Sequence, residues 1–256
     1  MTKVYENYVN GIKMLEKRTE LIPTAFGGKE EKEVGQYLLW HENGQKASEG
    51  NYKDGQKDGQ HLWWYEDGKK EYERNYKYGE LDGLVTGWYE NGQKSDERNY
   101  KYGKKDGQYL LWHENGQKAS EGNYKDGKKY GQHLWWYEDG QKGCEENYKN
   151  GQLDGQQLSW YENGQKSREE NFIKPKNRIR SKVDGLQIRW HENGQKKSEE
   201  NYKNGKEEGL YTAWYENGQK RCEINYKMGK LISSIEWDEE GNEIDRMHYM
   251  GVIKQS

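Results

Sequence analysis

The chain has 256 residues, of which only 30% are hydrophobic and 34% are charged, so it cannot bury a thick aliphatic core. Its 11 tryptophans and 22 tyrosines nevertheless exclude the composition of a disordered segment. The net charge of −3 gives no basic excess for nucleic acid, and no run of apolar residues is long enough to span a membrane as a helix. We therefore predict a thin folded sheet whose small core consists of stacked aromatic rings.

The N-terminus and the cysteines bear on the cellular compartment. Met1–Leu15 lacks the charged and then apolar pattern of a signal peptide. If Met1 is the native start, we expect a cytoplasmic protein, with association with the cell envelope left open. Cys144 and Cys222 occupy the same position of repeats three apart. That separation is too large for a disulfide, so we predict free thiols.

Residues 1–34 are predicted to form an irregular N-terminal cap. Val4–Lys13 reads V-Y-E-N-Y-V-N-G-I-K, a degenerate copy of the repeat that follows, with Gly11 at the turn position. Pro23 and the pair Gly27-Gly28 interrupt the remainder. Terminal repeats of an array are usually atypical because they cover an open edge.

Residues 35–230 are predicted to be tandem repeats of about 24 residues. Tryptophan recurs at this interval, with one gap of 30 before the seventh: Trp40, Trp64, Trp88, Trp112, Trp136, Trp160, Trp190 and Trp214. Each is followed by Glu-Asn-Gly or Glu-Asp-Gly, and a second Gly-bearing turn follows a second extended run. A fixed period of this length indicates a repeat architecture, and such turns between short runs are typical of β-hairpins. We predict an all-β fold, an elongated single-sheet array of antiparallel β-hairpins with about nine 24-residue units.

The parity of side chains within the repeat depends on the turn at Gly44. A two-residue loop would place Leu38 beside Glu49, whereas a three-residue loop with Gly44 left-handed divides the residues differently. We predict the three-residue loop. One face then carries Leu38, Trp40, Ser48, Gly50 and Tyr52, and the other carries Tyr37, Leu39, His41, Ala47, Glu49 and Asn51. The first face is aromatic plus small, as a core of stacked rings requires.

A basic insertion at 173–184 breaks the period, because Phe172–Gly185 is six residues longer than its counterparts. Five cations precede its first acid, Asp184: Lys174, Lys176, Arg178, Arg180 and Lys182. A solvated loop is the simplest interpretation, and a local positive patch that suits an acidic partner is the alternative. The last segment, residues 231–256, is predicted to be a C-terminal cap hairpin with its turn at Gly241.

The repeated motif W-Y-E-N-G-Q-K-x-x-E-x-N-Y-K-N-G-K-x-x-G resembles the MORN (membrane occupation and recognition nexus) repeat variant of bacterial proteins, many of which are described as antitoxins. The resemblance covers roughly residues 35–241. It implies antitoxin or toxin-immunity roles, envelope association, or scaffolding on protein or lipid, and it implies no catalytic residues. The 30-residue repeat at Trp160–Arg189 and the first 34 residues depart from the pattern.

Most repeated side chains have a structural explanation. The Trp and Tyr ladders are expected to be core, and rows of Glu and Lys are expected to neutralise each other. The histidines lack a third ligand for a metal, and no nucleophile motif is present, so we predict no enzyme, no cofactor and no metal site. The candidate partner-binding residues are the outward rings and the insertion cations: Trp63, Tyr65, Tyr89, Trp135, Tyr137, Tyr161, Lys174, Lys176, Arg178, Arg180 and Lys182.

The predicted function is that of a non-catalytic, protein-binding repeat module. By resemblance it is an antitoxin or immunity protein that sequesters a cognate toxin through an extended aromatic and charged face. The alternative is a membrane- or envelope-associated scaffold that binds lipid or glycan. Nucleic acid is disfavoured, because the basic insertion has no interleaved aromatic residue on which bases could stack.

Overall fold

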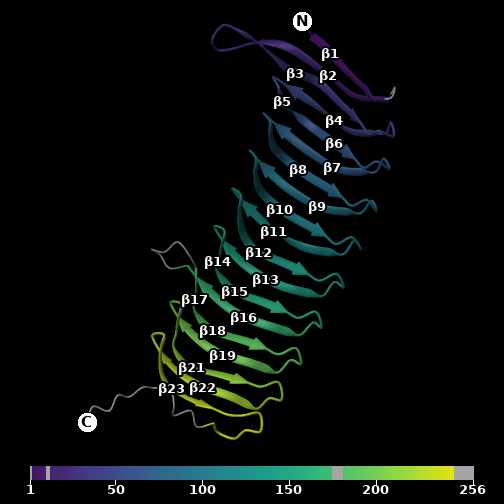
Figure 1. Cartoon of the computed structure of the whole chain (residues 1–256). Helices are drawn as coiled ribbons and strands as arrows, with labels where there is room; N and C mark the ends of the chain where they lie inside the picture. Colours follow the sequence, from purple (N-terminus) through teal and green to yellow (C-terminus); the bar gives the residue numbers. More distant parts are fainter. Residues whose placement is uncertain (1, 10–11, 175–180, 245–256) are drawn as a thin grey trace, which may run out of the picture. The chain divides into compact units, whose positions relative to one another are not determined.

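The computed structural model describes residues 2–9, 12–174 and 181–244 (Figure 1). The chain divides into two compact units, an N-terminal unit (Met1–Lys129) and a C-terminal unit (Tyr130–Ser256), and each is described by itself. Every regular element in the described residues is a strand, and these strands form a 23-stranded antiparallel open sheet. The described part contains no helix long and apolar enough to cross a membrane. The predicted all-β array of hairpins is therefore confirmed.

Within each unit the hairpins follow one another in chain order (Figure 1). The strands of the N-terminal unit are β1 (Thr2–Val9), β2 (Ile12–Pro23), β3 (Lys29–Trp40), β4 (Lys46–Lys53), β5 (Gln56–Lys57), β6 (Gly59–Trp64), β7 (Lys70–Lys77), β8 (Glu80–Trp88), β9 (Lys94–Lys101), β10 (Lys104–Trp112) and β11 (Lys118–Lys125). Strand β12 (Lys128–Trp136) begins at the end of that unit and pairs with β13. The C-terminal unit continues with β13 (Lys142–Lys149), β14 (Gln152–Leu153), β15 (Gly155–Trp160), β16 (Lys166–Ile173), β17 (Lys182–Val183), β18 (Gly185–Trp190), β19 (Lys196–Lys203), β20 (Lys206–Glu207), β21 (Gly209–Trp214), β22 (Lys220–Lys227) and β23 (Lys230–Glu236).

The turn between β3 and β4 is the predicted three-residue loop. The His41 amide donates to the Gln45 carbonyl at 2.8 Å, and the Gly44 amide donates to the His41 carbonyl at 2.9 Å. Gly44 has φ +83°, the left-handed region that glycine adopts without steric cost. Equivalent bonds recur in the later repeats, so the Glu-Asn-Gly signal sets this turn throughout.

The predicted faces are wrong, because a second irregularity follows this turn. Trp40 pairs with Lys46, but Leu39 pairs with Ser48, which leaves Ala47 as an extra, bulged residue. The bulge reverses the parity that the odd loop had set. Residues opposite each other in an antiparallel pair share a face. Two faces result, which we name the tryptophan face, with Leu38, Trp40 and Glu49 in the first repeat, and the tyrosine face, with Tyr37, Leu39, Ser48, Gly50 and Tyr52.

The second turn of the repeat is a two-residue hairpin loop, except in the repeat that carries the insertion. Lys53 pairs with Gln56, and the two residues between them, Asp54 and Gly55, have φ of 53° and 79°. Two consecutive positive φ values define the type I′ turn, whose twist matches that of the flanking strands. The paired Asp-Gly and Asn-Gly signals of the sequence therefore close the hairpins on both edges.

On the tryptophan face, the indoles lie beneath lysines rather than in a buried core. The Lys46 ammonium lies 2.6 Å from the Glu49 carboxylate and 5.3 Å from the ring centre of Trp64 in the following repeat. The same ion pair joins Lys70 to Glu73 and recurs along the array. The predicted neutralisation of the Glu and Lys rows is confirmed. A half-buried indole of the next repeat also lies under the ammonium groups of Lys46, Lys70, Lys142, Lys166 and Lys196.

The buried core is thin and contains few apolar side chains. Among the described residues the buried hydrophobic positions are Val85, Ala119, Ala213 and Cys222. Several polar side chains are buried beside them on the tyrosine face, including His61, which is 2% exposed. Burial lowers the pKa of His61, and its Nε2 lies 2.8 Å from the Asn51 carbonyl oxygen. The contact of His61 with Asn51 joins neighbouring repeats within a core that contains little apolar surface.

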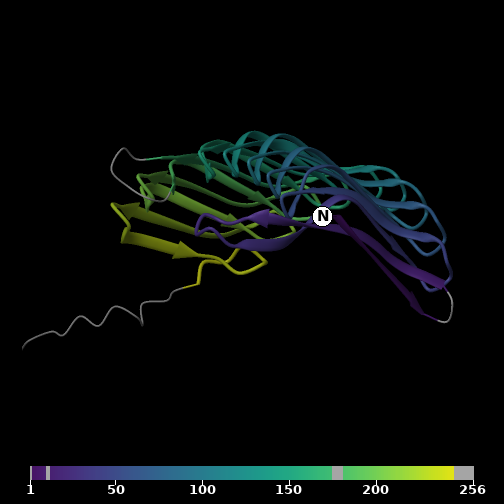
Figure 2. The ribbon, with the colours of Figure 1, turned by 90° about the horizontal axis from the view of Figure 1, so that it is seen from above.

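The two ends differ from the expected caps in one respect. Strands β1 and β2 pair as a long hairpin, visible in purple in Figure 2, where we expected an irregular segment. At the other end, the Asp238 amide donates to the Asn242 carbonyl around the predicted turn at Gly241. Gly11 and the last residues of the expected C-terminal cap, 245–256, lie outside the described residues.

Candidate partner-binding surface

All four predicted partner-binding tyrosines hold neighbouring repeats together. The hydroxyls of Tyr65 and Tyr89 donate to the carbonyls of Trp88 and Trp112 at 2.6 and 2.7 Å. In the C-terminal unit, Tyr137 donates to Trp160 at 2.9 Å and Tyr161 donates to Trp190 at 2.8 Å. These rings are half-buried and their hydroxyls are engaged within the sheet, which leaves only part of each ring for a partner.

Histidine replaces tyrosine at this position in some repeats and makes the same contact. His41 Nε2 lies 2.8 Å from the Trp64 carbonyl, and His191 Nε2 lies 3.0 Å from the Trp214 carbonyl. These histidines therefore have a structural role in place of a tyrosine hydroxyl. The described residues contain no group of three His, Cys, Asp or Glu side chains that could hold a metal ion.

The two predicted tryptophans outside the main ladder lie on the tyrosine face, one in each unit. In the N-terminal unit, the Arg74 guanidinium lies 4.9 Å and the Lys57 ammonium 5.1 Å from the ring centre of Trp63. In the C-terminal unit, Trp135 is 37% exposed and meets the Tyr137 ring edge-on at 4.5 Å. Trp135 lies directly over Gly143, where an added Cβ would overlap the indole. Trp135 and Tyr137 are thus two candidate partner-binding residues whose rings the fold brings into contact.

The basic insertion extends a two-residue turn. Ile173 pairs with Lys182, and the Lys182 ammonium donates to the Asn204 carbonyl at 3.0 Å. Lys174 is exposed at the start of the insertion. Lys176, Arg178 and Arg180 lie outside the described residues. Lys182 thus belongs to the hairpin framework, and Lys174 is the exposed insertion cation within the described part.

The structure reveals a second basic feature, on the tyrosine face of the C-terminal unit. The exposed side chains of Arg168, Arg189, Lys197 and Arg221 are brought together from strands β16, β18, β19 and β22. Arg168 and Arg189 are directly opposite each other in neighbouring strands. Sequence reasoning missed this cluster because it compared repeats by their shared residues. Comparing equivalent positions of all repeats, and looking for cations that replace small residues, would have found the cluster.

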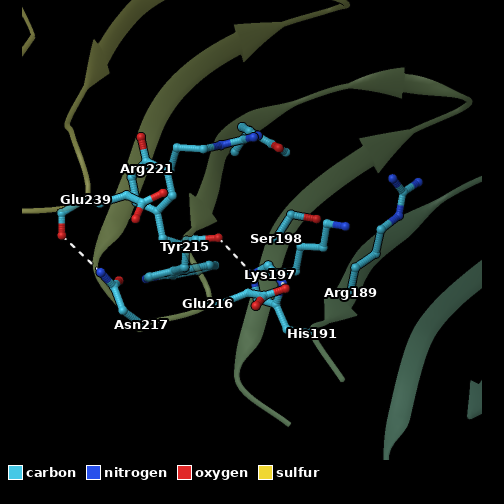
Figure 3. Close-up of a pocket in the computed structure, with 11 residues that line it drawn as sticks. Arg189, His191, Lys197, Ser198, Tyr215, Glu216, Asn217, Arg221 and Glu239 are labelled. Atoms are coloured by element: carbon cyan, nitrogen blue, oxygen red, sulfur yellow. Dashed lines mark hydrogen bonds and ion pairs between the residues drawn. The ribbon is translucent and has the colours of Figure 1, made fainter. Parts of the chain in front are cut away.

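Three of these cations surround a pocket of about 520 Å³ (Figure 3). Figure 3 shows Lys197 and Arg189 on one side and Arg221 with Glu239 on the other. The pocket is lined by Arg189, His191, Lys197, Ser198, Tyr211, Trp214, Tyr215, Glu216, Asn217, Arg221 and Glu239. Cations, aromatic rings and acids therefore meet in one open cavity.

The acids near the cluster differ in how firmly they are held. Glu170 is 7% exposed and lies 2.6 Å from the Arg168 guanidinium and 3.8 Å from that of Arg189. The Glu200 carboxylate accepts from the Tyr202 hydroxyl at 3.2 Å, and burial together with that carboxylate raises the pKa of Tyr202 to about 12. Glu170 therefore balances part of the charge of Arg168 and Arg189, whereas no described carboxylate lies within ion-pair distance of Lys197.

Neither Cys144 nor Cys222 forms a disulfide, as predicted. Cys222 is buried, and its burial raises the pKa of the thiol. A raised pKa leaves less of the thiolate that nucleophilic chemistry requires. Cys222 therefore acts as a small packing residue of the C-terminal unit.

Comparison with known proteins identifies the repeats. The family model described as MORN repeat variant matches seven segments: residues 33–54, 57–78, 81–102, 105–126, 153–174, 183–204 and 207–228. No curated protein matches the chain. A crystal structure of TcdB2-TccC3-Cdc42 aligns at 10% identity over 93% of this chain and 16% of that one, with a TM-score of 0.20. One of TcdB2-TccC3 aligns at 13% identity over 94% of this chain and 18% of that one, with a TM-score of 0.20. At these scores neither alignment supports an argument about fold or function.

Proposed function

The chain belongs to the MORN repeat variant family, and from this premise we propose that it is a non-catalytic module that binds an acidic protein through the tyrosine face of its C-terminal unit. Repeats of this family are commonly protein- or membrane-binding modules. No active site would be needed for such a role. Binding would act by covering the surface of the partner.

The observation that supports the proposal is a division between repeated and variable side chains. The repeated residues make contacts within the sheet. The Tyr161 hydroxyl joins neighbouring repeats, and Lys46 forms an ion pair with Glu49 of the same repeat. The variable residues of the C-terminal unit include exposed cations such as Arg189 and Arg221. Desolvated arginine and aromatic side chains contribute strongly to protein interfaces, so a partner would find its anchors in the variable positions.

A more specific form of the proposal is an antitoxin or immunity protein that sequesters a cognate toxin. It rests on the resemblance of the repeat to antitoxin-described proteins. An open antiparallel sheet offers a broad rigid surface, which loses little conformational entropy when it covers a partner. In addition to the basic cluster, we propose Trp135, Tyr137 and Lys174 as contacts with the partner.

A membrane- or envelope-bound scaffold is the second candidate, and the N-terminal unit carries an observation that favours it. Tyr78 and Tyr102 are 70% and 64% exposed on two-residue turns, at φ of 53° and 49°. The Lys77 and Lys101 ammonium groups lie 5.7 and 5.8 Å from these ring centres. Bulky side chains seldom adopt positive φ, and exposed rings beside cations suit the interface of an anionic lipid surface.

Affinity capture from the native cell, followed by binding measurements with the purified partner, tests the proposal. We expect a protein partner whose affinity falls when Arg168 and Arg189 are replaced together by Gln, which removes both charges but keeps hydrogen-bond donors for the buried Glu170. A matched double variant at the exposed turn lysines Lys203 and Lys227 should bind like the wild type. Equal binding by both variants would reject the basic face. Co-sedimentation with anionic liposomes that high salt abolishes would favour the scaffold instead.

A further inference from the structure

We propose that the pocket between β18, β19 and β22 holds the carboxylate of a glutamate or aspartate side chain from an acidic peptide segment, between Lys197 and Arg221. This inference deepens the proposed function and rests on it, since it names the chemical group that the C-terminal unit recognises. The pocket of about 520 Å³ has room for such a side chain and the peptide backbone beside it.

The internal repeats provide a comparison for each lining residue. Lys197 and Arg221 stand at the bulged position of their repeats, between the Trp–Lys pair and the next pair of the ladder. The same position is occupied elsewhere by Ala47, Glu71, Ser95, Ala119, Gly143 and Ser167. The bulge itself therefore needs no long cation. The bulge therefore does not explain why two consecutive repeats carry a cation at this position. Both of these cations line the same pocket.

The charges of Lys197 and Arg221 are not neutralised within the described part of the chain. Their immediate neighbours Lys196 and Lys220 form ion pairs with Glu199 and Glu223. No described carboxylate lies within ion-pair distance of Lys197 or Arg221. The Arg221 guanidinium instead donates to the Tyr211 hydroxyl and the Cys222 thiol, which are uncharged groups. Within the described residues, the fold therefore supplies a carboxylate for Lys196 and Lys220 and none for Lys197 and Arg221.

The surroundings favour one carboxylate over a run of phosphates. Glu216 and Glu239 also line the pocket, and the Glu216 carboxylate lies 3.7 Å from His191. A nucleic acid backbone crossing this region would bring phosphates close to both acids, whereas a single carboxylate can sit between the cations. Arginine also binds a carboxylate with two parallel hydrogen bonds, which gives the site directional selectivity.

The aromatic lining fits the side chain of an acidic residue better than a nucleic acid base. The Tyr215 hydroxyl donates to the Trp237 carbonyl at 2.9 Å, and the Lys196 ammonium lies 5.9 Å from the ring centre of Trp214. Both rings are half-buried, and Lys196 lies over one face of Trp214, so little ring surface is exposed for base stacking. Their edges can contact the methylene groups of a glutamate.

Fluorescence anisotropy with a dye-labelled, C-terminally amidated hexaglutamate peptide tests the inference on the full chain at low salt. We expect saturable binding that weakens about tenfold for each of Lys197→Ala and Arg221→Ala, since one charge-assisted contact is worth about a factor of ten. Alanine stands at this position in the first and fourth complete repeats, so the variants should keep the wild-type unfolding midpoint. The double variant Lys203→Ala/Lys227→Ala removes the same charge from the same repeats and should change affinity less than twofold.

Three results would overturn the inference. The first is no binding of hexaglutamate at millimolar concentration. The second is an equal loss of affinity in a Lys197→Ala/Arg221→Ala double variant and in the Lys203→Ala/Lys227→Ala double variant, which would show unspecific attraction. The third is tighter binding of a labelled oligothymidylate than of hexaglutamate. If a captured native partner binds the Lys197/Arg221 variant as well as the wild type, the pocket assignment fails while the proposed function stands. If the wild type binds hexaglutamate but captures no protein, the proposed function fails instead.

Discussion

Replacing Gly116 by valine tests the turn on which every repeat depends. Gly116 has φ +83° and its amide donates to the His113 carbonyl at 2.9 Å. The left-handed conformation costs an ordinary residue about 1–2 kcal/mol, and a β-branched residue more. An added Cβ would also meet the Gln93 amide oxygen, the flexible end of a side chain that can move aside. We expect Gly116→Val to lower the free energy of unfolding by about 2–3 kcal/mol.

Two measurements check this magnitude. For a chain of this length, about 2–3 kcal/mol corresponds to a fall in Tm of about 5–10 °C. Hydrogen exchange should also quicken locally at the His113 amide, which donates to the Gln117 carbonyl across the same turn. The control is Gly92→Ala, because Gly92 has φ +86° but an added Cβ there meets only Lys69, at 3.8 Å. It should lower the free energy of unfolding by about 1 kcal/mol. A Gly116→Val variant with wild-type Tm and exchange would refute the requirement for a left-handed glycine.

Further predictions concern the contacts between repeats, the buried histidine and the insertion. Tyr161→Phe removes the hydroxyl that donates to Trp190 and should lower the free energy of unfolding by about 1 kcal/mol in denaturant titrations, whereas Tyr161→His should retain part of it. Because burial lowers the pKa of His61 in the folded state, the unfolded state binds more protons below about pH 6.5. Stability should therefore fall as the pH decreases through that range, and His61→Gln should flatten the profile; identical profiles would contradict the assignment. Replacing Lys174–Ser181 by Asn-Gly should restore the ordinary turn and the wild-type Tm while weakening partner binding, and unchanged binding would make the insertion a spacer.

The sequence by itself determined the features that are local or periodic. The 24-residue interval of tryptophan predicted the hairpin array, and the Glu-Asn-Gly signal predicted the left-handed glycine at position 44. The ion pair between Lys46 and Glu49 also followed from the sequence, since like charges stacked along a sheet must be neutralised. Each of these depends on residues within one repeat or on the repetition itself.

The faces of the sheet were decided by the tertiary structure. The bulge at Ala47 reverses the side-chain parity, and its position is filled in other repeats by residues as different as Glu71, Gly143 and Arg221. The first residue of such a bulge adopts a conformation open to nearly any amino acid, so composition carries no signal of it. A one-residue shift was enough to exchange which rings lie beneath lysines and which lie beside the buried polar residues.

The basic pocket likewise became visible only in three dimensions. Arg189, Lys197 and Arg221 come from three strands, and they meet because antiparallel pairing places successive hairpins side by side. In the sequence they are isolated cations in a chain that contains 42 of them. The register of the strands, set by hydrogen bonds between repeats, is what turns them into one site.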